Sequence, residues 1–364
     1  MTTSADQRNR LLQFASDNYA PATPEAWAAM EQANAGYVSS YGADQWTLRA
    51  SDKLRELFEI DCEVYFCYTG TAANSMAIAH LCQSYHSVIA HETSHIETDE
   101  CGGPEFFSHG SKLLLTAGEG GKIQPEAIGR LVHKRTDIHY PKPNVLSLTQ
   151  STEVGTVYSP AELDRLHESA RRHHLRVHMD GSRFANAVAS LGVAPKELTW
   201  KVGVDVLCFG GSKNGLPLGE AVIFFDRKLA SEFDYRCKQA GQLASKMRYI
   251  TAPWVGTLTA GAWLAHAAIA NQRARQLAEG LAKVAGVQVL HPVEANAVFV
   301  QVPETWLPRL REAGLGGYTF IGNGLRLMCN WSTSPADVAA AVELVQSLSL
   351  GERAVASSPP GAGT

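Results

Sequence analysis

Short apolar runs alternate with longer segments of helical periodicity between about residue 62 and residue 225. Six of these runs predict β-strands, and their sequences are EVYFCY, HSVIAHE, NVLSLTQ, LRVHMD, DVLCFGG and EAVIFF. The segments AANSMAIAHLCQSY and PAELDRLHESARRHH predict helices between strands, and a further strand is expected near Ser111–Ala117. Because apolar strands that alternate with helices form sheets covered on both faces, the pattern predicts an α/β fold with a mostly parallel sheet.

The pattern changes after Trp254, where an alanine-rich segment from Gly256 to Ala285 predicts one long helix. Strands are expected in the runs VQVL, AVFVQV and LRLMCN that follow, and PADVAAAVELVQSL predicts a closing helix. This order of elements indicates a smaller α+β domain at the C-terminal end, which the long helix connects to the first domain.

The expected domain organisation has four parts. Residues 1–15 lack a strong periodicity and are expected to form an N-terminal arm that lies on the main domain or on a partner chain. Residues 16–253 would form the large domain and residues 254–350 the small one. Residues 351–364 have the composition of a disordered tail.

Composition and charge give no sign of a nucleic-acid or membrane partner. The 364 residues carry a formal net charge of -4, so no basic surface for an anionic polymer is indicated. No apolar run reaches the roughly 20 residues of a membrane-spanning helix, and the polar start MTTSADQRNR lacks the apolar core of a secretory signal. The seven cysteines include no CxxC pair, so neither a disulfide framework nor a structural zinc site is indicated. The sequence therefore predicts a soluble cytoplasmic protein.

Three segments carry candidate chemistry, and each lies where a predicted strand gives way to a loop. The first, Tyr68–Asn74, opens a helix with glycine and small hydroxyl residues. Free N–H groups and the positive end of the helix dipole favour an anion there, which makes Gly70 and Thr71 candidate phosphate ligands. The alternative is that Thr71 simply caps the helix.

The second segment, His178–Arg183, lies at the C-terminal end of a strand, where the ligands of open α/β sheets gather. A carboxylate at Asp180 is able to hold the protonated nitrogen of a pyridine ring, which keeps that ring an electron sink. The alternative is a local role, in which Asp180 caps the following turn and pairs with Arg183.

The third segment, Phe209–Gly215, follows the apolar run DVLCF and contains Lys213 between glycines and a serine. Lysine is almost never fully buried without a partner. Desolvation beside a cofactor favours Schiff-base chemistry at such an amine. The alternative is a lysine that contacts a phosphate or lies on a surface turn.

Together these segments resemble the fold-type I pyridoxal-phosphate enzymes and, more narrowly, the low-specificity threonine aldolases of the β-eliminating lyase group. The resemblance runs from about Ser16 to Ser349. Its motifs are Ser16-Asp17 with the later Pro-Ala-Thr, Tyr41-Gly42-Ala43-Asp44, Gly70-Thr71-Ala72-Ala73-Asn74, Ser94-His95-Ile96 through Glu100-Cys101-Gly102-Gly103, Asp180-Gly181-Ser182-Arg183 and Ser212-Lys213-Asn214-Gly215. No single motif is decisive, whereas their joint order and spacing are specific.

The resemblance implies a large domain of the fold-type I transferase class that binds pyridoxal 5'-phosphate. It implies cleavage of L-threonine, allo-threonine and related β-hydroxy-α-amino acids, phenylserine among them, to glycine and an aldehyde. Lys213 would attach the cofactor, Asp180 would pair with its pyridine nitrogen, and His95 would stack over its face. Further cofactor contacts are implied for Gly70, Thr71, Arg183 and Ser212, and substrate contacts for Ser16, Arg183, Arg248 and Arg326.

Several features of the family remain open at this point. The base that takes the hydroxyl proton could be His95, Glu100 or a held water. Many relatives have a histidine near the substrate hydroxyl where this chain has Glu153, so Glu153 is a candidate substrate contact and the threo or erythro preference is open. Lys238 and Lys246 compete for one lysine position of the family. Relatives are homotetramers in which the counterpart of Tyr41 reaches the partner's active site.

Parts of the sequence are also compatible with other functions. His91-Glu92-Thr93-Ser94-His95 matches the HExxH pattern of zinc hydrolases, but the pattern needs both histidines on one helix face, and this segment follows a predicted strand. No metal is therefore expected. The remaining alternatives are another pyridoxal-phosphate reaction, by a racemase, an aminotransferase or a β-eliminating lyase, and a non-catalytic binding module on the same fold.

Overall fold

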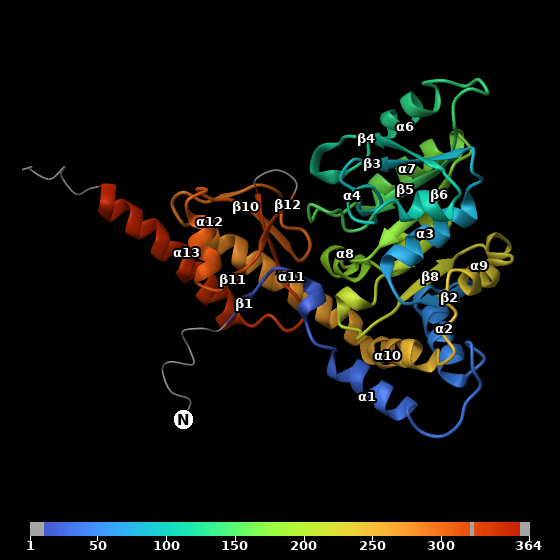
Figure 1. The fold of residues 1–364 in the computed structure, drawn as a ribbon, viewed down its shortest axis with the longest axis horizontal. Helices are drawn as coiled ribbons and strands as arrows, with labels where there is room; N and C mark the ends of the chain where they lie inside the picture. The colour runs from blue at the N-terminus through green and yellow to red at the C-terminus, as the bar shows by residue number, and fades with distance from the viewer. Residues whose placement is uncertain (1–10, 321–323, 357–364) are drawn as a thin grey trace, which may run out of the picture.

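The chain folds into two lobes, which the long helix α11 (Ala262–Leu281) joins (Figure 1). The structure is a computed structural model, and it describes residues 11–320 and 324–356. The larger lobe contains a seven-stranded sheet, and the smaller lobe contains a four-stranded one. No helix in these two ranges is both long and apolar enough to cross a membrane.

The strands of the large sheet lie in the order β2-β8-β7-β6-β5-β3-β4. Their bounds are β2 (Glu63–Cys67), β3 (His86–His91), β4 (Lys112–Thr116), β5 (Lys142–Thr149), β6 (Arg176–Gly181), β7 (Val206–Phe209) and β8 (Glu220–Phe224). Only β8 runs against its neighbours, since it is antiparallel to both β2 and β7. The mostly parallel sheet is therefore confirmed, and β4 is the further strand expected near Ser111–Ala117.

Both faces of the large sheet are buried, as the apolar runs predicted. Along β7, Leu207 and Phe209 pack into one core cluster, while Val206 and Cys208 pack into another. This alternation follows from the two-residue period of a strand. Helices cover both faces, and their bounds are α1 (Pro24–Ala33), α2 (Gln45–Phe58), α3 (Gly70–Leu81), α4 (His95–Thr98), α5 (Gly103–Phe107), α6 (Pro125–Val132), α7 (Pro160–Arg172), α8 (Phe184–Leu191), α9 (Phe233–Gln239) and α10 (Arg248–Leu258).

Short 3-10 turns complete the large lobe. They are η2 (Asp17–Tyr19), η3 (Glu119–Gly121), η4 (Pro195–Leu198), η5 (Trp200–Val202), η6 (Ser212–Asn214), η7 (Arg227–Ala230) and η8 (Thr259–Gly261). The last of these interrupts the helix predicted from Gly256 to Ala285, so that prediction is wrong in its continuity. Helix α10 ends where Thr259 takes an extended conformation with ψ of 135°, and Gly261, whose left-handed φ of 72° suits glycine, precedes the start of α11.

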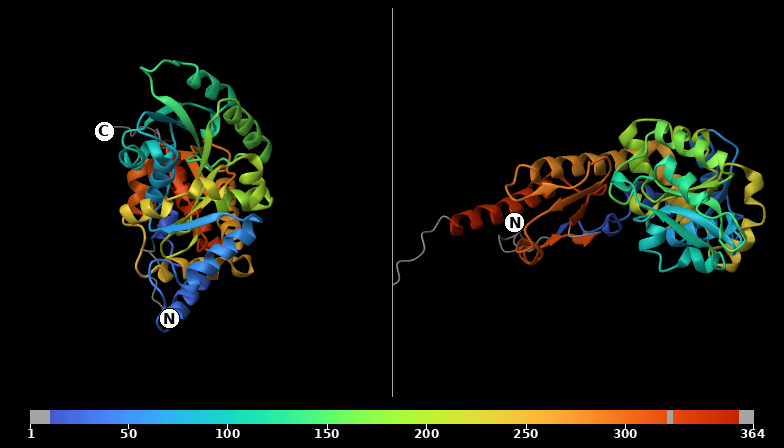
Figure 2. Two further views of the ribbon diagram at one scale, coloured as in Figure 1. Left: turned by 90° about the vertical axis from the view of Figure 1, so that its right-hand side faces the viewer. Right: turned by 90° about the horizontal axis from the view of Figure 1, so that it is seen from above.

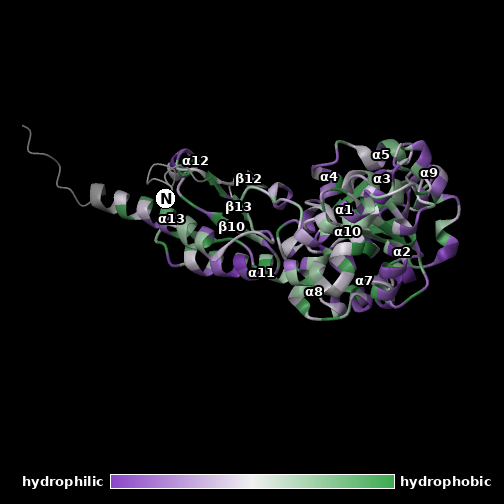
Figure 3. Cartoon of the chain, turned by 90° about the horizontal axis from the view of Figure 1, so that it is seen from below, coloured by the Kyte–Doolittle hydropathy of each residue, from purple (hydrophilic) through white to green (hydrophobic). Residues whose placement is uncertain are grey.

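The small lobe has its own sheet and its own core. The strands lie in the order β12-β13-β10-β9, with bounds β9 (Gln288–Val289), β10 (Ala297–Gln301), β12 (Tyr318–Phe320) and β13 (Gly324–Met328). Helices α11, α12 (Trp306–Glu312) and α13 (Pro335–Ala356) belong to this lobe. Figure 3 shows hydrophobic residues along β10 and β13, which supply a core cluster separate from that of the large sheet. This separation supports the predicted division into two domains.

The two ends of the chain depart from the expected organisation. Residues of the predicted arm form β1 (Leu12–Gln13), which pairs in parallel with β11 (Leu315–Gly316) of the small lobe. The arm was expected on the main domain or on a partner. The disordered tail predicted from residue 351 begins too early, because α13 continues to Ala356 at the far end of the small lobe (Figure 2). Residues 1–10 and 357–364 lie outside the described residues.

Candidate active site

Lys213 lies in η6, directly beyond the buried end of β7. The two glycines before it are required by close backbone packing. A Cβ at Gly210 would lie 2.3 Å from the carbonyl oxygen of Ser182. A Cβ at Gly211 would lie 2.4 Å from the carbonyl oxygen of Gly219. Because only glycine fits between these neighbours, the turn brings Lys213 to the wall of a cavity of about 280 Å³.

This cavity brings together all three segments that the sequence singled out. It lies beyond the carboxyl ends of β6 and β7, where ligands of open α/β sheets are expected. Its lining residues are Asn18, Tyr68, Thr69, Gly70, Thr71, His95, Ser182, Ser212, Lys213 and Glu220.

The N-terminal end of α3 faces this cavity. Thr69 is the N-cap, because its hydroxyl accepts a hydrogen bond from the amide of Ala72 at 3.2 Å. The alternative in which Thr71 caps the helix is therefore wrong. Gly70 and Thr71 occupy the first turn, whose amides have no partner inside the helix. This end of α3 therefore offers donors to an anion such as a phosphate.

Asp180 lies at the end of β6 and is 1% exposed. Its carboxylate accepts hydrogen bonds from the amide and hydroxyl of Ser182, at 2.9 and 2.8 Å, and from Nδ2 of Asn74 at 3.0 Å. Burial by itself would raise the pKa of Asp180, but the charges of His95 and Lys213 outweigh it and the pKa is lowered. Asp180 is therefore a buried anion that is ready to pair with a cation.

His95 begins α4, and its ring lies beside the fully buried side chain of Glu100. Nδ1 of His95 and Oε1 of Glu100 are 2.8 Å apart. Asn74 donates to the same oxygen at 2.8 Å and thus links Glu100 to Asp180. Burial acts to lower the pKa of His95, but the hydrogen bond to Glu100 and the charge of Asp180 raise it overall. Burial raises the pKa of Glu100.

His95, Glu100 and Asp180 bring potential metal-ligand atoms within 4.8 Å of one another. His95 is hydrogen-bonded to Glu100, and Asn74 donates to both Glu100 and Asp180, so these side chains already form a hydrogen-bonded group. The HExxH alternative requires a helix that carries both histidines. His91 instead ends β3, whereas His95 begins α4, so the two do not share a helix. This segment therefore does not form the zinc-binding HExxH motif, which needs both histidines on one helix.

Arg183 is buried in an ion pair that the sequence did not reveal. Its Nε and Nη2 donate to the two carboxylate oxygens of Asp17, at 2.7 and 3.0 Å. Of the local alternative, the turn cap is confirmed, because Asp180 accepts from the amide and hydroxyl of Ser182, whereas the pairing of Arg183 with Asp180 is wrong. The Nη1 atom of Arg183 lies 3.8 Å from Oε2 of Glu153. Asn296 of the small lobe also donates to Asp17, at 3.0 Å. The site thus contains one polar cluster that both lobes share.

Arg326 on β13 extends this cluster from the small lobe. It is 6% exposed, with its guanidinium carbon 4.2 Å from the centre of the Tyr318 ring, so it is not an exposed strand residue. Burial and the charge of Arg183 lower the pKa of Arg326 to about 10, although Glu153 and Asp17 act in the opposite direction. The cluster thus holds two guanidiniums and two carboxylates, and the planar guanidinium of Arg326 is suited to bind an anion such as a carboxylate.

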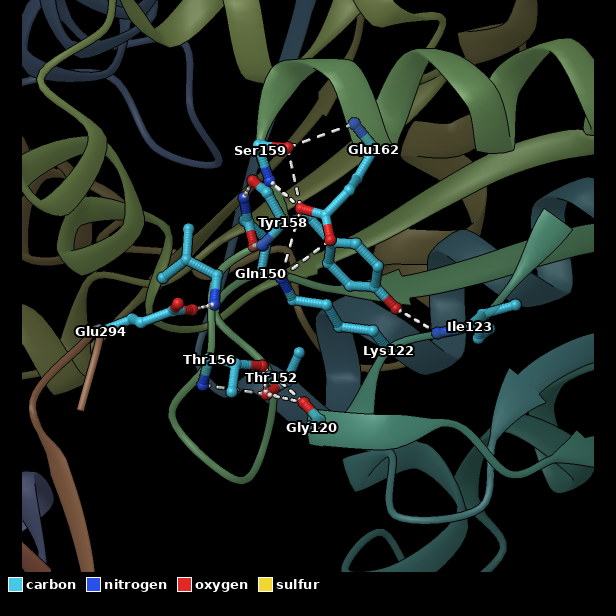
Figure 4. Close-up of polar contacts among 11 residues, drawn as sticks. Gly120, Lys122, Ile123, Gln150, Thr152, Thr156, Tyr158, Ser159, Glu162 and Glu294 are labelled. Atoms are coloured by element: carbon cyan, nitrogen blue, oxygen red, sulfur yellow. Dashed lines mark hydrogen bonds and ion pairs between the residues drawn. The ribbon is translucent and has the colours of Figure 1, made fainter. Parts of the chain in front are cut away.

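The loop that carries Glu153 is held by many hydrogen bonds, which Figure 4 shows. Gln150 exchanges hydrogen bonds with the backbone of Tyr158, at 2.8 and 3.0 Å. The hydroxyls of Thr152 and Thr156 are 2.8 Å apart, and both donate to the carbonyl of Gly120. Glu153 therefore occupies a fixed position next to Arg183.

The remaining predicted site residues differ in their placement. Ser16 caps η2 with its hydroxyl and so positions Asp17. Arg248 donates to the carbonyl of Gly36 at 3.1 Å and is not among the described residues that line the cavity. Tyr41 is half-exposed, with Nζ of Lys238 lying 4.3 Å from the centre of its ring.

Three functional candidates escaped the sequence reasoning, and they are Asp17, Asn74 and Glu220. Asp17 and Asn74 stood inside the quoted motifs, but nothing in their spacing identified their partners. Glu220 is the first residue of β8 and accepts a hydrogen bond from the amide of Gly211. The sequence feature that could have identified it is a charged residue at the start of the apolar run EAVIFF. That residue was interpreted only as part of a predicted strand.

Comparison with known proteins places the chain in one family. A sequence model of the β-eliminating lyase family matches residues 13–305. The chain is 61% identical over 327 residues to the low specificity L-threonine aldolase of a Pseudomonas species. The aligned region covers 90% of this chain and 94% of the relative. It is 62% identical over 322 residues to the Pseudomonas aeruginosa protein of that name. That aligned region covers 88% of this chain and 93% of the relative.

Solved structures agree with this assignment. The threonine aldolase of Leishmania major superposes with a TM-score of 0.87 at 25% identity, over 92% of this chain and 99% of that one. An Escherichia coli protein with a methionine aminotransferase function superposes with a TM-score of 0.72 at 13% identity, over 94% of this chain and 95% of that one. At this low identity, the likeness shows a shared fold alone. The predicted fold class is confirmed, and the chain belongs to the β-eliminating lyase family.

Proposed function

We propose that this protein is a pyridoxal 5'-phosphate-dependent aldehyde-lyase of the threonine aldolase type. It cleaves the Cα–Cβ bond of L-threonine, L-allo-threonine and related β-hydroxy-α-amino acids, phenylserine among them, and releases glycine and an aldehyde. One observation carries the proposal. Lys213 and the N-terminal end of α3 line one cavity with Ser182, to which Asp180 is hydrogen-bonded, in a chain 61% identical to a low specificity L-threonine aldolase.

The residues at the cavity fit the cofactor at each of its functional groups. Lys213 offers an amine for its aldehyde, and the buried anion of Asp180 suits its protonated pyridine nitrogen. Gly70, Thr71 and Ser212 would hold the phosphate. When bound, the cofactor supplies an electron sink for the electron pair left on Cα as the bond breaks.

Arg326 is the residue we propose for the substrate carboxylate. Its planar guanidinium is suited to a bidentate grip, and its burial strengthens an ion pair with a bound carboxylate. Arg183 itself is held by Asp17, so it acts mainly by fixing the charge next to Arg326. Glu153, whose Oε2 lies 3.8 Å from Nη1 of Arg183, stays a proposed contact for the substrate side chain.

His95 is the base we propose for the β-hydroxyl proton. Its ring lines the cavity, whereas Glu100 has no exposed side-chain surface and can act only through His95. Glu100 is therefore a positioning residue. By holding Nδ1 of His95, it directs the other ring nitrogen toward the cavity and makes the imidazole a stronger base.

Glu100→Gln is expected to move the acidic limb of the kcat/KM pH profile to lower pH. The carboxylate raises the pKa of His95, so its removal lets the ring lose its proton at lower pH. The profile is measured with L-threonine, and Glu97→Gln on the exposed side of α4 is the matched control. An unmoved acidic limb in Glu100→Gln would show that His95 is not the base.

A second prediction concerns the cofactor linkage. The purified protein is expected to be yellow, and borohydride is expected to discharge the colour by reducing the bond between Lys213 and the cofactor. Peptide mapping should place the reduced cofactor on the peptide that contains Lys213. A label on Lys238 or Lys246 would overturn the assignment.

The reaction itself is tested by measuring both products. Aldehyde and glycine are expected in equal amounts from L-threonine, L-allo-threonine and the phenylserine stereoisomers. An α-keto acid would indicate an aminotransferase or a β-eliminating lyase, and an inverted substrate a racemase. Bound cofactor without turnover of any of these substrates would indicate the non-catalytic module.

The assembly and location of the protein remain part of the proposal. A homotetramer is supported by large aromatic side chains left exposed on the single chain, which include Tyr37, Trp27 and Tyr41. Tyr41 would then reach the active site of the partner. Sedimentation of the holoenzyme at micromolar concentration tests this, and a monomer would contradict it. A cytoplasmic location is kept as a prediction, to be checked by cell fractionation.

A further inference from the structure

Glu220 places a buried carboxylate in the cavity that we assign to an anionic cofactor. It is the first residue of β8, the antiparallel strand that lies between β2 and β7. Its side chain accepts a hydrogen bond from the amide of Gly211 and lines the cavity together with Ser212 and Lys213. The turn that carries Lys213 is therefore hydrogen-bonded to this acid at its first residue.

The position of this acid creates an electrostatic conflict with the ligand. The residues proposed to hold the phosphate, Gly70, Thr71 and Ser212, line the same cavity as Glu220. A phosphate monoester is mainly dianionic at neutral pH. Two buried anions in one small cavity repel each other, and the repulsion is relieved when one of them takes up a proton.

We propose, on the basis of the proposed function, that Glu220 takes up a proton when the phosphate of the cofactor binds. The protonated carboxyl then stays hydrogen-bonded to the Lys213 turn and couples that turn to the phosphate. Glu220 is a positioning residue in this account, and its protonation makes phosphate binding depend on pH.

The surroundings of Glu220 support a proton that exchanges near neutral pH. Burial raises the pKa of Glu220 to about 7, although the neighbouring Ser212, the hydrogen bond from Gly211 and the charge of Lys213 oppose the rise. The other titratable groups that face it are the thiols of Cys67 and Cys208, whose pKa values burial raises, and Tyr68 and His95, which line the same cavity. Lys213 is a cation that lines the same cavity and acts on Glu220 through its charge.

The direction of the pH dependence follows from these facts. At pH values below the pKa that Glu220 has in the ligand-free protein, Glu220 already carries its proton, and ligand binding takes up none. Above it, binding must add one, so phosphate affinity falls as the pH rises. In wild type, the dissociation constant for a phosphate-bearing ligand should rise up to about tenfold per pH unit from about pH 7 to about pH 9.

Two ligands that differ only in the phosphate isolate this effect. Pyridoxine 5'-phosphate and pyridoxine both lack the aldehyde, so neither reacts with Lys213, and both share the same pyridine nitrogen. Calorimetric titration of the full chain, freed of cofactor, in buffers of different ionisation enthalpy measures the protons taken up. At about pH 8, we expect wild type to take up about one proton more with pyridoxine 5'-phosphate than with pyridoxine.

Variants then assign the proton to its residue. Glu220→Gln keeps the shape and a hydrogen-bond acceptor, and we expect it to abolish the extra uptake and to flatten the pH dependence. The matched control is Glu168→Gln on the exposed side of α7, which should behave as wild type. Equal uptake in wild type and Glu220→Gln, or equal uptake with both ligands in wild type, would overturn the proposal. The second comparison needs no variant, so a misfolded Glu220→Gln would leave the test in place.

Failure of this inference differs from failure of the proposed function. If aldehyde and glycine are released but the phosphate-linked proton is missing, only the role of Glu220 is wrong. If neither ligand nor the complete cofactor binds, the cofactor assignment is wrong, and the role of Glu220 falls with it.

Discussion

Asp180→Ala should fold normally and lose at least about a hundredfold in kcat for L-threonine, the scale for removing one preorganised electrostatic group. The carboxylate is held as an anion by hydrogen bonds from Ser182 and Asn74. Without it, the pyridine nitrogen loses the partner that keeps it protonated, and the electron pair left on Cα is poorly stabilised. Steady-state kinetics at saturating cofactor measure the loss.

Two comparisons separate this role from a structural one. Asp164→Ala removes a carboxylate from the exposed side of α7 and should leave kcat unchanged. Ser182→Ala removes one hydrogen bond to Asp180 but keeps the charge, so its effect should be intermediate. Near-normal turnover by a folded, cofactor-loaded Asp180→Ala would refute the electron-sink role.

Arg326→Gln should reduce kcat/KM for L-threonine by about a hundredfold, mainly through KM, which corresponds to roughly 2.7 kcal/mol of lost binding. The reason is that a buried guanidinium that grips a carboxylate has no substitute of equal charge in the cluster, because Arg183 is already paired with Asp17. Cofactor affinity should stay near that of wild type, since Arg326 is not among the residues that line the cofactor cavity.

The control for this experiment is Arg275→Gln, which removes an exposed arginine from α11 in the same lobe. It should leave both KM and kcat unchanged. An unchanged KM in Arg326→Gln, with the cofactor bound, would show that another cation receives the substrate carboxylate.

The large sheet could be predicted from the sequence because its strands are buried on both faces. Such strands read as continuous apolar runs, and glycine or polar residues mark where each ends. The break at Gly261 could not be predicted with the same rule, since isolated glycines are tolerated inside many helices. The position of the N-terminal arm could not be predicted for a different reason. β1 is two residues long, and it forms only because β11, some 300 residues later, supplies its partner.

The candidate site divides in the same physical way. Lys213, Asp180 and the Gly70-Thr71 pair follow strand ends, so their shared edge of the sheet could be predicted from the order of elements. Long-range side-chain pairs could not. The bond from Asn74 to Asp180 spans 106 positions, and that from Arg183 to Asp17 spans 166. No local pattern records such contacts, which arise only when distant segments pack together.

Asp17 accepts hydrogen bonds from Arg183 in the large lobe and from Asn296 in the small lobe, and it is itself part of the N-terminal segment. Three stretches of chain therefore share a single acid. A chimera that exchanged the small lobe between two relatives would have to transfer Asn296 and the matching N-terminal segment together. Otherwise the transplanted lobe would leave one buried charge or amide without its complement. The two lobes are thus not interchangeable modules at the active site, because both depend on the same buried acid.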